Sequence, residues 1–121
     1  MLIKGAREMV FMDKRLYERF RIELPVRFKD YSGQDWQEAV SYDISARGIR
    51  LASVRQEIKP QDSLILSLEL PGEEGNILCN CRVVWVKPQA QDAREAGLEF
   101  NEIRLLNLRR IFDKERELIG E

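Results

Sequence analysis

The sequence predicts an all-β domain, folded as a small antiparallel barrel or a strongly curled sheet, that ends in one α-helix. Apolar and polar residues alternate in six short runs, and turn-forming residues separate these runs. In the last stretch of the chain, apolar residues recur every three and four positions instead, which is typical of a helix. A barrel is favoured because closing a sheet removes its exposed edges.

Size and charge limit the classes of protein that the chain can belong to. It has 121 residues, which suits one domain with a real core. Its formal net charge is -1, from 20 Lys and Arg against 21 Asp and Glu, which argues against general nucleic-acid binding. No apolar run is long enough to span a membrane, and residues 9–12 are too short for a signal-peptide core. We therefore expect a soluble, cytoplasmic protein without membrane insertion.

The chain divides into a lead-in, an arm, a barrel and a helix. Residues 1–13 show no sustained periodicity and predict a flexible lead-in. Residues 14–21 form an arm with four basic residues and one acid. The predicted barrel covers residues 22–100, and the predicted helix covers residues 102–119 with Asn101 as a candidate N-cap.

Six runs are predicted to form the strands of the barrel. In the first run, Pro25 suggests either an edge strand or a bulge, because proline has no N–H for strand pairing. In the fifth run, the residues two apart from Ile77 to Trp85 are predicted to share one face. The runs cover residues 22–28, 36–42, 48–53, 64–70, 77–86 and 96–100.

The two cysteines, Cys79 and Cys81, lie two apart in the fifth run and therefore point to the same face. This spacing is poorly suited to a disulfide. The chain has no histidine and no second thiol pair, so a metal site is not expected either. We expect two buried, reduced thiols, which fits a reducing compartment.

The sequence offers little for catalysis. Without histidine there is no ordinary Ser–His or Cys–His pair. The sequence has neither a phosphate-binding glycine loop nor a dinucleotide fingerprint. We expect a protein that is not an enzyme and that carries no cofactor.

A binding function is better supported than catalysis. The evidence is the stretch from Tyr42 to Leu51, which joins the second run to the third. Asp43 can accept hydrogen bonds from the amino and imino groups of a base, and Ser45 can donate or accept. These two residues share a face on extended backbone. Gly48 allows a positive φ or a close approach to a ligand. From chemistry alone, an ordinary Asp–Ser turn with a glycine bulge is an equal alternative.

The arm supplies the other half of the predicted site. Arg15 and Arg19 are four apart and converge on one side if the arm turns helically. An arginine fork meets phosphate oxygens in pairs and matches the O6 and N7 edge of guanine. With Asp43 and Ser45, the two arginines predict a site for a small anionic ligand. A solvated, charged linker is the alternative for the arm.

In these two segments the sequence resembles the PilZ domain family. Residues 15–19 fit the RxxxR pattern of its arm, and residues 43–48 fit its (D/N)xSxxG pattern. Both motifs occur in the family's order, with residues 24–26 between them and residues 83–85 and 97–100 after them. The resemblance covers nearly the whole chain.

The resemblance implies a six-stranded antiparallel barrel and a receptor for the bacterial second messenger cyclic di-GMP. By the family pattern, Arg15 and Arg19 grip phosphates and guanine edges from the arm. Asp43 and Ser45 hydrogen-bond a guanine from the barrel surface, and Gly48 keeps the turn open. The ligand would order the arm and so change the surface shown to a downstream protein partner, whose identity the family pattern does not specify.

Four further residues have secondary expectations. Lys14 occupies a position that in this family bears on ligand number, and a basic residue there favours two stacked ligand molecules over one. Arg47 and Arg50 are expected in solvent, although Arg47 lies inside the motif and is a candidate ligand contact. Trp85 is expected to pack in the core or on the helix, with a base-stacking platform as the alternative.

Two other functions stay open. A relative that no longer binds nucleotide would be a protein-interaction adaptor that uses its helix or an open sheet edge. A small barrel that binds single-stranded nucleic acid suits the fold but not the net charge of -1. The apolar stripe of the helix is expected to pack within the molecule, which predicts a monomer or a weak homodimer.

Overall fold

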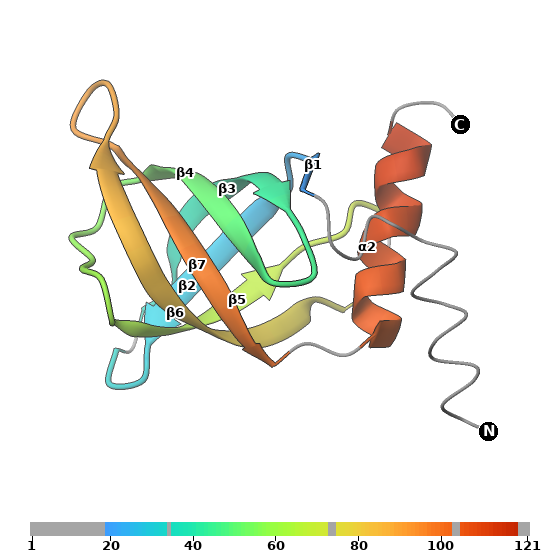
Figure 1. The fold of residues 1–121 in the computed structure, drawn as a ribbon, viewed down its shortest axis with the longest axis horizontal. Helices are drawn as coiled ribbons and strands as arrows, with labels where there is room; N and C mark the ends of the chain where they lie inside the picture. The colour runs from blue at the N-terminus through green and yellow to red at the C-terminus, as the bar shows by residue number, and fades with distance from the viewer. Residues whose placement is uncertain (1–18, 34, 73–74, 103–104, 119–121) are drawn as a thin grey trace.

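A computed structural model describes residues 19–33, 35–72, 75–102 and 105–118 (Figure 1). Within these residues the chain forms strands and one helix, in the predicted order. The strands are β1 (Phe20–Arg21), β2 (Pro25–Asp30), β3 (Gln37–Ile44), β4 (Gly48–Val54), β5 (Ser63–Leu68), β6 (Ile77–Pro88) and β7 (Arg94–Glu102), and the helix is α2 (Leu105–Leu118).

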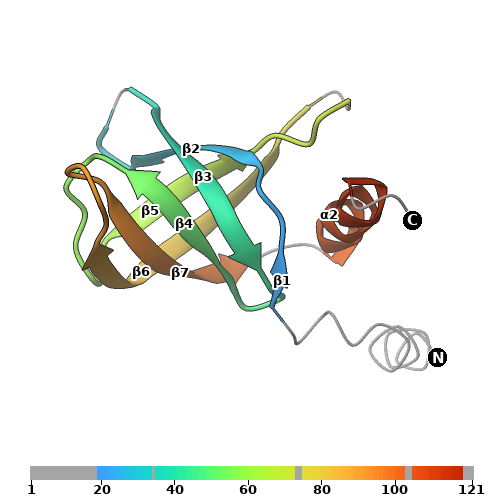
Figure 2. The same cartoon turned by 90° about the horizontal axis from the view of Figure 1, so that it is seen from above.

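Strands β2 to β7 form a closed antiparallel barrel. Their order around the barrel is β3-β2-β5-β6-β7-β4, and β4 pairs with β3 to close the ring. Strand β1 adds a short pairing to the end of β3, beside the barrel (Figure 2). The prediction of a six-stranded antiparallel barrel with a C-terminal helix is confirmed. Each of the six barrel strands pairs on both sides, so none of them offers an open edge.

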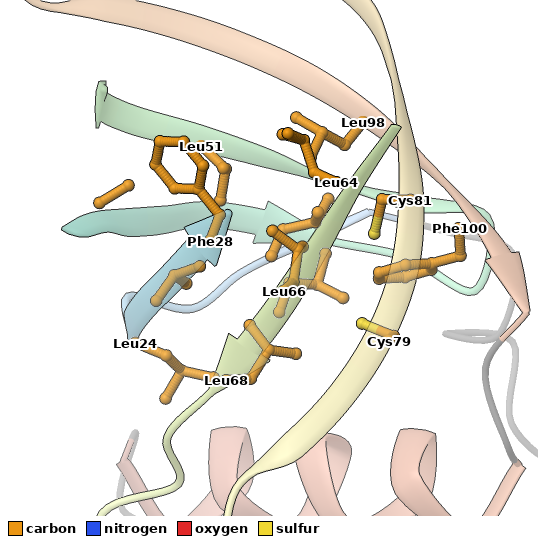
Figure 3. Packing of buried hydrophobic residues seen from close by; sticks show 14 of the residues in the cluster. Leu24, Phe28, Leu51, Leu64, Leu66, Leu68, Cys79, Cys81, Leu98 and Phe100 are labelled. Atoms are coloured by element: carbon orange, nitrogen blue, oxygen red, sulfur yellow. The ribbon is translucent and has the colours of Figure 1, made fainter. Parts of the chain in front are cut away.

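The core lies inside the barrel and is built from the inward positions of the alternating runs. Burial alternates with exposure along β2 and along the first part of β6, as the apolar pattern predicts. Phe28 on β2, Leu51 on β4, Leu66 on β5 and Phe100 on β7 all point into this one interior (Figure 3). Burial of these faces is what holds the sheet in its closed form.

Helix α2 covers one end of the barrel (Figure 1). Ile111 is fully buried in the same cluster as the barrel residues, and Phe112 is 2% exposed. Asn101 does not cap the helix, because β7 continues through Glu102, which pairs with Asn80 of β6. No helix in the described part of the chain is long and apolar enough to cross a membrane.

The two cysteines lie inside the barrel on β6. Cys79 and Cys81 are both buried and free, as predicted (Figure 3). A hydrogen bond with Cys79, together with burial, raises the pKa of the Cys81 thiol. Cys81 therefore behaves as a neutral apolar residue of the core at physiological pH.

Pro25 is the first residue of an interior strand. Strand β2 pairs with β3 on one side and β5 on the other, so the edge-strand alternative is wrong. The bulge alternative is correct: just before Pro25, residues 22–24 stand opposite only two residues of β3, residues 41–42. This bulge separates β1 from β2.

The side chain of Ser41 fills this bulge. Its hydroxyl accepts a hydrogen bond from the Leu24 N–H at 2.9 Å and donates one to the Ile22 carbonyl. Ser41 is 1% exposed, so it satisfies two backbone groups that would otherwise be buried without partners. The bulge is thereby fixed between the arm and the barrel.

A second bulge, in β6, sends Trp85 out of the core. The register between β6 and β7 shifts between Val83 and Trp85. Beyond the exposed Val84, it is Val86 that packs against the core, while the Trp85 ring lies over Gly97 on the outer face. The prediction that Trp85 packs in the core or on the helix is wrong: an extra residue reverses the faces of all that follow it, and α2 lies near the opposite end of β6 (Figure 1).

Candidate functional site

A third bulge, in β3, aims the predicted acid outward. The register between β3 and β4 shifts between Ser41 and Asp43, which leaves Tyr42 without an opposite residue on β4. Before the bulge Ala39 faces the core, and after it Ile44 does. Tyr42 and Asp43 therefore both project from the outer surface of the barrel, next to each other.

The Asp43 carboxylate is held by two arginines, one on each oxygen. Arg19 Nη1 donates to Oδ1 at 2.7 Å, and Arg50 Nη2 donates to Oδ2 at 2.6 Å. The Asp43 side chain is only 7% exposed, whereas those of Arg19 and Arg50 are 48% and 31% exposed. Charge-assisted hydrogen bonds of this length are among the stronger polar contacts in proteins. The contact with Arg19 joins the end of the arm to the barrel.

Tyr42 brings a third arginine to the same place. The guanidinium carbons of Arg21 and Arg50 both lie 4.2 Å from the centre of the Tyr42 ring. Arg21 and Arg50 are also the cross-strand partners of Asp43, on β1 and β4 respectively. We call Arg19, Arg21 and Arg50 the arginine cluster. Two of its members bind the Asp43 carboxylate, while Arg21 lies over Tyr42 and within 3.8 Å of Glu23. The cluster leaves local positive charge for an anion.

Arg50 is the member of this cluster whose hydrogen bonds are incomplete. Within the described residues, its Nε is buried and has no hydrogen-bond partner. A buried N–H without an acceptor is costly, and such groups mark sites where a ligand or water completes the contact.

The loop after Asp43 is closed by Ser45. The Ser45 N–H donates to the Gly48 carbonyl at 2.9 Å, and the Ser45 hydroxyl accepts from the Arg47 N–H at 3.2 Å. The Arg47 side chain is exposed, while its carbonyl accepts from the Phe100 N–H at 2.8 Å. The loop is thus a tight turn anchored to β7, which both alternatives for this stretch allow.

Gly48 is required for a close approach between strands. A Cβ at this position would lie 2.1 Å from the carbonyl oxygen of Leu98 on β7. The glycines with positive φ in the described chain are Gly72 and Gly75, so the positive-φ alternative does not apply to Gly48. Gly48 lets β4 approach β7 and so positions the loop that precedes it.

A row of cross-strand neighbours continues from Arg50 across the barrel. On β7, Gly97 is the cross-strand partner of both Arg50 and Trp85. A Cβ on Gly97 would lie 2.2 Å from Trp85 Nε1, so the absence of a side chain makes room for the indole. The Lys87 ammonium lies 5.0 Å from the Trp85 ring centre. Trp85 is thus two strands from Arg50 in a row that also contains Asp43.

Comparison with known proteins agrees with this architecture. The sequence matches the PilZ domain over residues 13–114. The chain belongs to the PilZ domain family. No curated protein matches it.

Three solved structures share the fold of this PilZ domain. The Bacillus subtilis inhibitor of motility, MotI/DgrA, is 24% identical with a TM-score of 0.67, and the match covers 90% of this chain and 54% of that one. This chain therefore spans about half the length of MotI/DgrA. The PilZ domain of YcgR from Escherichia coli, solved with c-di-GMP, is 14% identical with a TM-score of 0.67, over 88% and 95% of the chains. The PilZ domain of CeSA from a cellulose-synthesizing bacterium is 16% identical with a TM-score of 0.54, over 85% and 96%.

The structure brings together part of the PilZ motif residues. Arg19 contacts Asp43 directly, Ser45 closes the adjoining loop and Gly48 positions that loop against β7. The other arm candidates, Arg15 and Lys14, lie outside the described residues. Among the residues that the structure describes, no group of three metal-ligating side chains occurs.

The sequence reasoning missed Arg50 and Arg21. Arg50 was expected in solvent, but it is an ion-pair partner of Asp43. The signal was present: Asp43 and Arg50 are equally far from the middle of a short loop, so a hairpin places them opposite each other. Arg21 could be found only with the pairing of β1 on β3, which no local pattern indicates.

Proposed function

We propose that this PilZ domain is a non-enzymatic receptor for cyclic di-GMP that acts in the cytoplasm. The observation that carries the proposal is the outward Asp43 carboxylate, which meets Arg19 of the arm and Arg50 of the barrel at 2.7 and 2.6 Å. Membership of the PilZ family supports the choice of ligand, as does the structure of the E. coli YcgR PilZ domain with c-di-GMP.

The chemistry of guanine fits Asp43. The imino N–H and the amino group of guanine are neighbouring donors that a carboxylate accepts in pairs. They resemble the donors of a guanidinium group, which is what Asp43 Oδ1 already binds in Arg19. Arg19 is thus an internal stand-in for the base. A guanine that takes its place at Asp43 releases the Arg19 guanidinium to meet a phosphate or the O6 and N7 edge.

The barrel supplies the parts that stay fixed during this exchange. Arg50 keeps its contact with Asp43 Oδ2, and its side chain, which is 31% exposed, adds positive charge beside the ligand. Ser45 offers a hydroxyl beside the loop. The half-buried Trp85 indole would stack on a purine once Lys87 moves from its ring, and Arg21 would add positive charge near the phosphates.

The arm residues Arg15 and Lys14 complete the proposal. Arg15 would bind a second phosphate or guanine edge, and Lys14 would favour a stacked pair of ligand molecules over one. Exchange of Arg19 from Asp43 to the ligand, with ordering of the arm, would alter the surface next to β1 and so carry the signal.

Isothermal titration with cyclic di-GMP tests the proposal. We expect Arg19→Ala and Asp43→Ala to weaken binding about tenfold or more, because each removes a charge-assisted hydrogen bond. Arg116→Ala, an exposed arginine on α2 that pairs with Asp113 at 3.9 Å, should bind like the wild type. Absence of heat at high ligand concentration, or equal binding by all variants, would refute the receptor function. The same titration gives the number of ligand molecules per chain and how Lys14→Ala changes it.

A further inference from the structure

The outer face of β3 carries a stripe of exposed residues that runs toward Asp43. Trp36, Glu38 and Val40 lie two apart and line one continuous surface hollow of about 540 Å³. We call these three residues the β3 stripe. Trp36 is 36% exposed and Val40 is 37% exposed, although every barrel strand is already paired on both sides. The two large apolar side chains therefore face solvent without contributing to closure of the barrel.

A second hollow, of about 420 Å³, borders the same stripe on the side of β2. Its exposed apolar surface comes from Pro25 and Val40, which are direct cross-strand partners. A closed barrel cannot accept an added strand, so any partner must bind here through side chains. An aliphatic side chain is the group that such an apolar floor accepts.

The rim of this hollow is acidic. Glu23, Glu38 and Glu69 line it, against a single base, Arg27. Arg27 Nε lies 4.0 Å from Glu69 Oε2, and both side chains are nearly half exposed, so this ion pair is weak. Among the described residues, Glu38 makes no ion pair, although Arg27 stands opposite it on β2. Glu23 Oε2 lies 3.8 Å from Arg21 Nη2, and both of these side chains are more than 60% exposed, so this ion pair is also weak. Glu38 therefore keeps an unpaired negative charge on a rim that carries three glutamates and one arginine.

We propose that the β3 stripe docks a protein segment with an aliphatic side chain flanked by lysine or arginine residues. The aliphatic group would bind on Pro25 and Val40, and the basic groups would pair with Glu38 and its acidic neighbours. The acidic rim disfavours an anionic membrane or a nucleic acid at the same place.

The position of the stripe links it to the arm. Glu23 belongs to the bulge between β1 and β2, which the Ser41 hydroxyl fastens at Ile22 and Leu24. A movement of the arm at Arg19 would thus be transmitted along the chain to Glu23 at the acidic rim. This link rests on the proposed receptor function, whereas docking on the stripe does not.

The test is a titration of the ¹⁵N-labelled full chain, followed by amide chemical shifts. The probe is the peptide acetyl-Lys-Val-Lys-Leu-Lys-amide, and its counterpart with glutamate in place of lysine is the charge control. We expect the lysine peptide to shift amides of β2 and β3, and the glutamate peptide to cause no shift. Glu38→Lys should weaken binding about tenfold, and Val40→Thr about fivefold.

Matched variants elsewhere separate a specific surface from general attraction. Glu57→Lys makes the same charge change in an exposed loop, and Leu78→Thr removes a similar apolar group that is 62% exposed on β6. Both should bind the peptide like the wild type. Absence of shifts at peptide concentrations on the order of 1 mM, or equal weakening by the control variants, would overturn the proposal. So would self-association that Val40→Thr abolishes, because the occupant would then be a second copy of the chain.

The variant Asp43→Ala distinguishes peptide binding on the β3 stripe from nucleotide binding at Asp43. Asp43→Ala, which the receptor function predicts to lose cyclic di-GMP, should keep the lysine peptide with unchanged affinity. If Asp43→Ala and Glu38→Lys lose the peptide equally, the peptide binds at the arginine cluster and the docking proposal is wrong.

Discussion

At the scale of single residues, Gly48 shows how one missing side chain positions the site. A Cβ at Gly48 would lie 2.1 Å from the Leu98 carbonyl oxygen, which belongs to the paired backbone of β7 and cannot move alone. We predict that Gly48→Ala lowers the free energy of unfolding by about 2–4 kcal/mol, because β4 and β7 must separate to relieve the overlap. Urea denaturation measures this loss.

Gly75 provides the matched control for that substitution. It has a φ of +80°, and a Cβ there would meet nothing within 4 Å. Gly75→Ala should therefore cost only about 1–2 kcal/mol of backbone strain. If the two alanine variants were equally stable, the close approach at Gly48 would not be the reason for its glycine.

Arg50 is the residue that we expect to orient the binding carboxylate. It holds Asp43 Oδ2 at 2.6 Å from a paired position on β4, whereas Arg19 approaches Oδ1 from the arm. We predict that Arg50→Lys, which keeps the charge but loses the planar fork, weakens cyclic di-GMP binding about tenfold. Titration calorimetry measures this effect.

A stability measurement separates orientation from folding in the Arg50 variants. Because Arg50 leaves its Nε buried and unpaired, its replacement also removes a cost. Arg50→Lys and Arg50→Gln should thus each change the free energy of unfolding by less than about 2 kcal/mol. Unchanged nucleotide affinity in Arg50→Lys would mean that Arg19 or the ligand alone orients Asp43.

At the scale of elements, the bulge between β1 and β2 decides where the arm meets the barrel. The Ser41 hydroxyl supplies the partners of the Leu24 N–H and the Ile22 carbonyl inside this bulge. We predict that Ser41→Ala lowers the free energy of unfolding by about 2–4 kcal/mol, because two buried backbone groups lose their partners. Amide exchange at residues 22–24 should become faster than in the rest of the barrel.

Ser67→Ala is the control for this effect. Ser67 is 5% exposed, but its hydroxyl accepts a hydrogen bond from the Asn76 side chain at 2.8 Å, so its removal costs a side chain and not a backbone group its partner. It should cost less than Ser41→Ala. Equal exchange rates at residues 22–24 in both variants would show that the bulge does not depend on the Ser41 hydroxyl.

Bulges also mark the limit of what the sequence predicts at this scale. Alternation located all six barrel strands, because inward positions repeat every two residues. An extra residue leaves no mark on composition, yet it reverses every face beyond it. The sequence therefore located Asp43 but not the outward pair that it forms with Tyr42, and it sent Trp85 to the wrong side.

At the scale of the whole molecule, closure of the barrel brings segments that are far apart in the sequence to one site. The sequence predicts closure because six short strands without a protected edge favour it, and the family resemblance names the same fold. The chemistry of the arm and of the stretch from Tyr42 to Leu51 placed Arg19 and Asp43 in one site, but their direct contact joins residues 24 positions apart and has no local signal. The pairing of β1 on β3, which brings Arg21 to the site, depends on the closed fold and has no local signal.

The helix is expected to be part of this single folded unit. Ile111 is fully buried in the same core cluster as the barrel residues, so α2 acts as a cover for one end. We predict that Ile111→Ala lowers the free energy of unfolding by about 2–5 kcal/mol, with a matching fall in Tm, because it leaves a cavity between helix and barrel. The fluorescence of Trp36 and Trp85, which lie on the barrel, should report the same transition as the helical circular dichroism.

Asp113→Ala is the control for Ile111→Ala. It alters the exposed face of α2, whereas Ile111→Ala alters the face that packs on the barrel. Asp113 is exposed and makes only a surface ion pair with Arg116 at 3.9 Å, so its removal should change stability by less than about 0.5 kcal/mol. A helix that were only an appendage would melt separately, and Ile111→Ala would then leave the tryptophan transition unchanged. A shared, lowered transition would instead show that the C-terminal cover and the nucleotide-binding barrel fold as one cooperative unit.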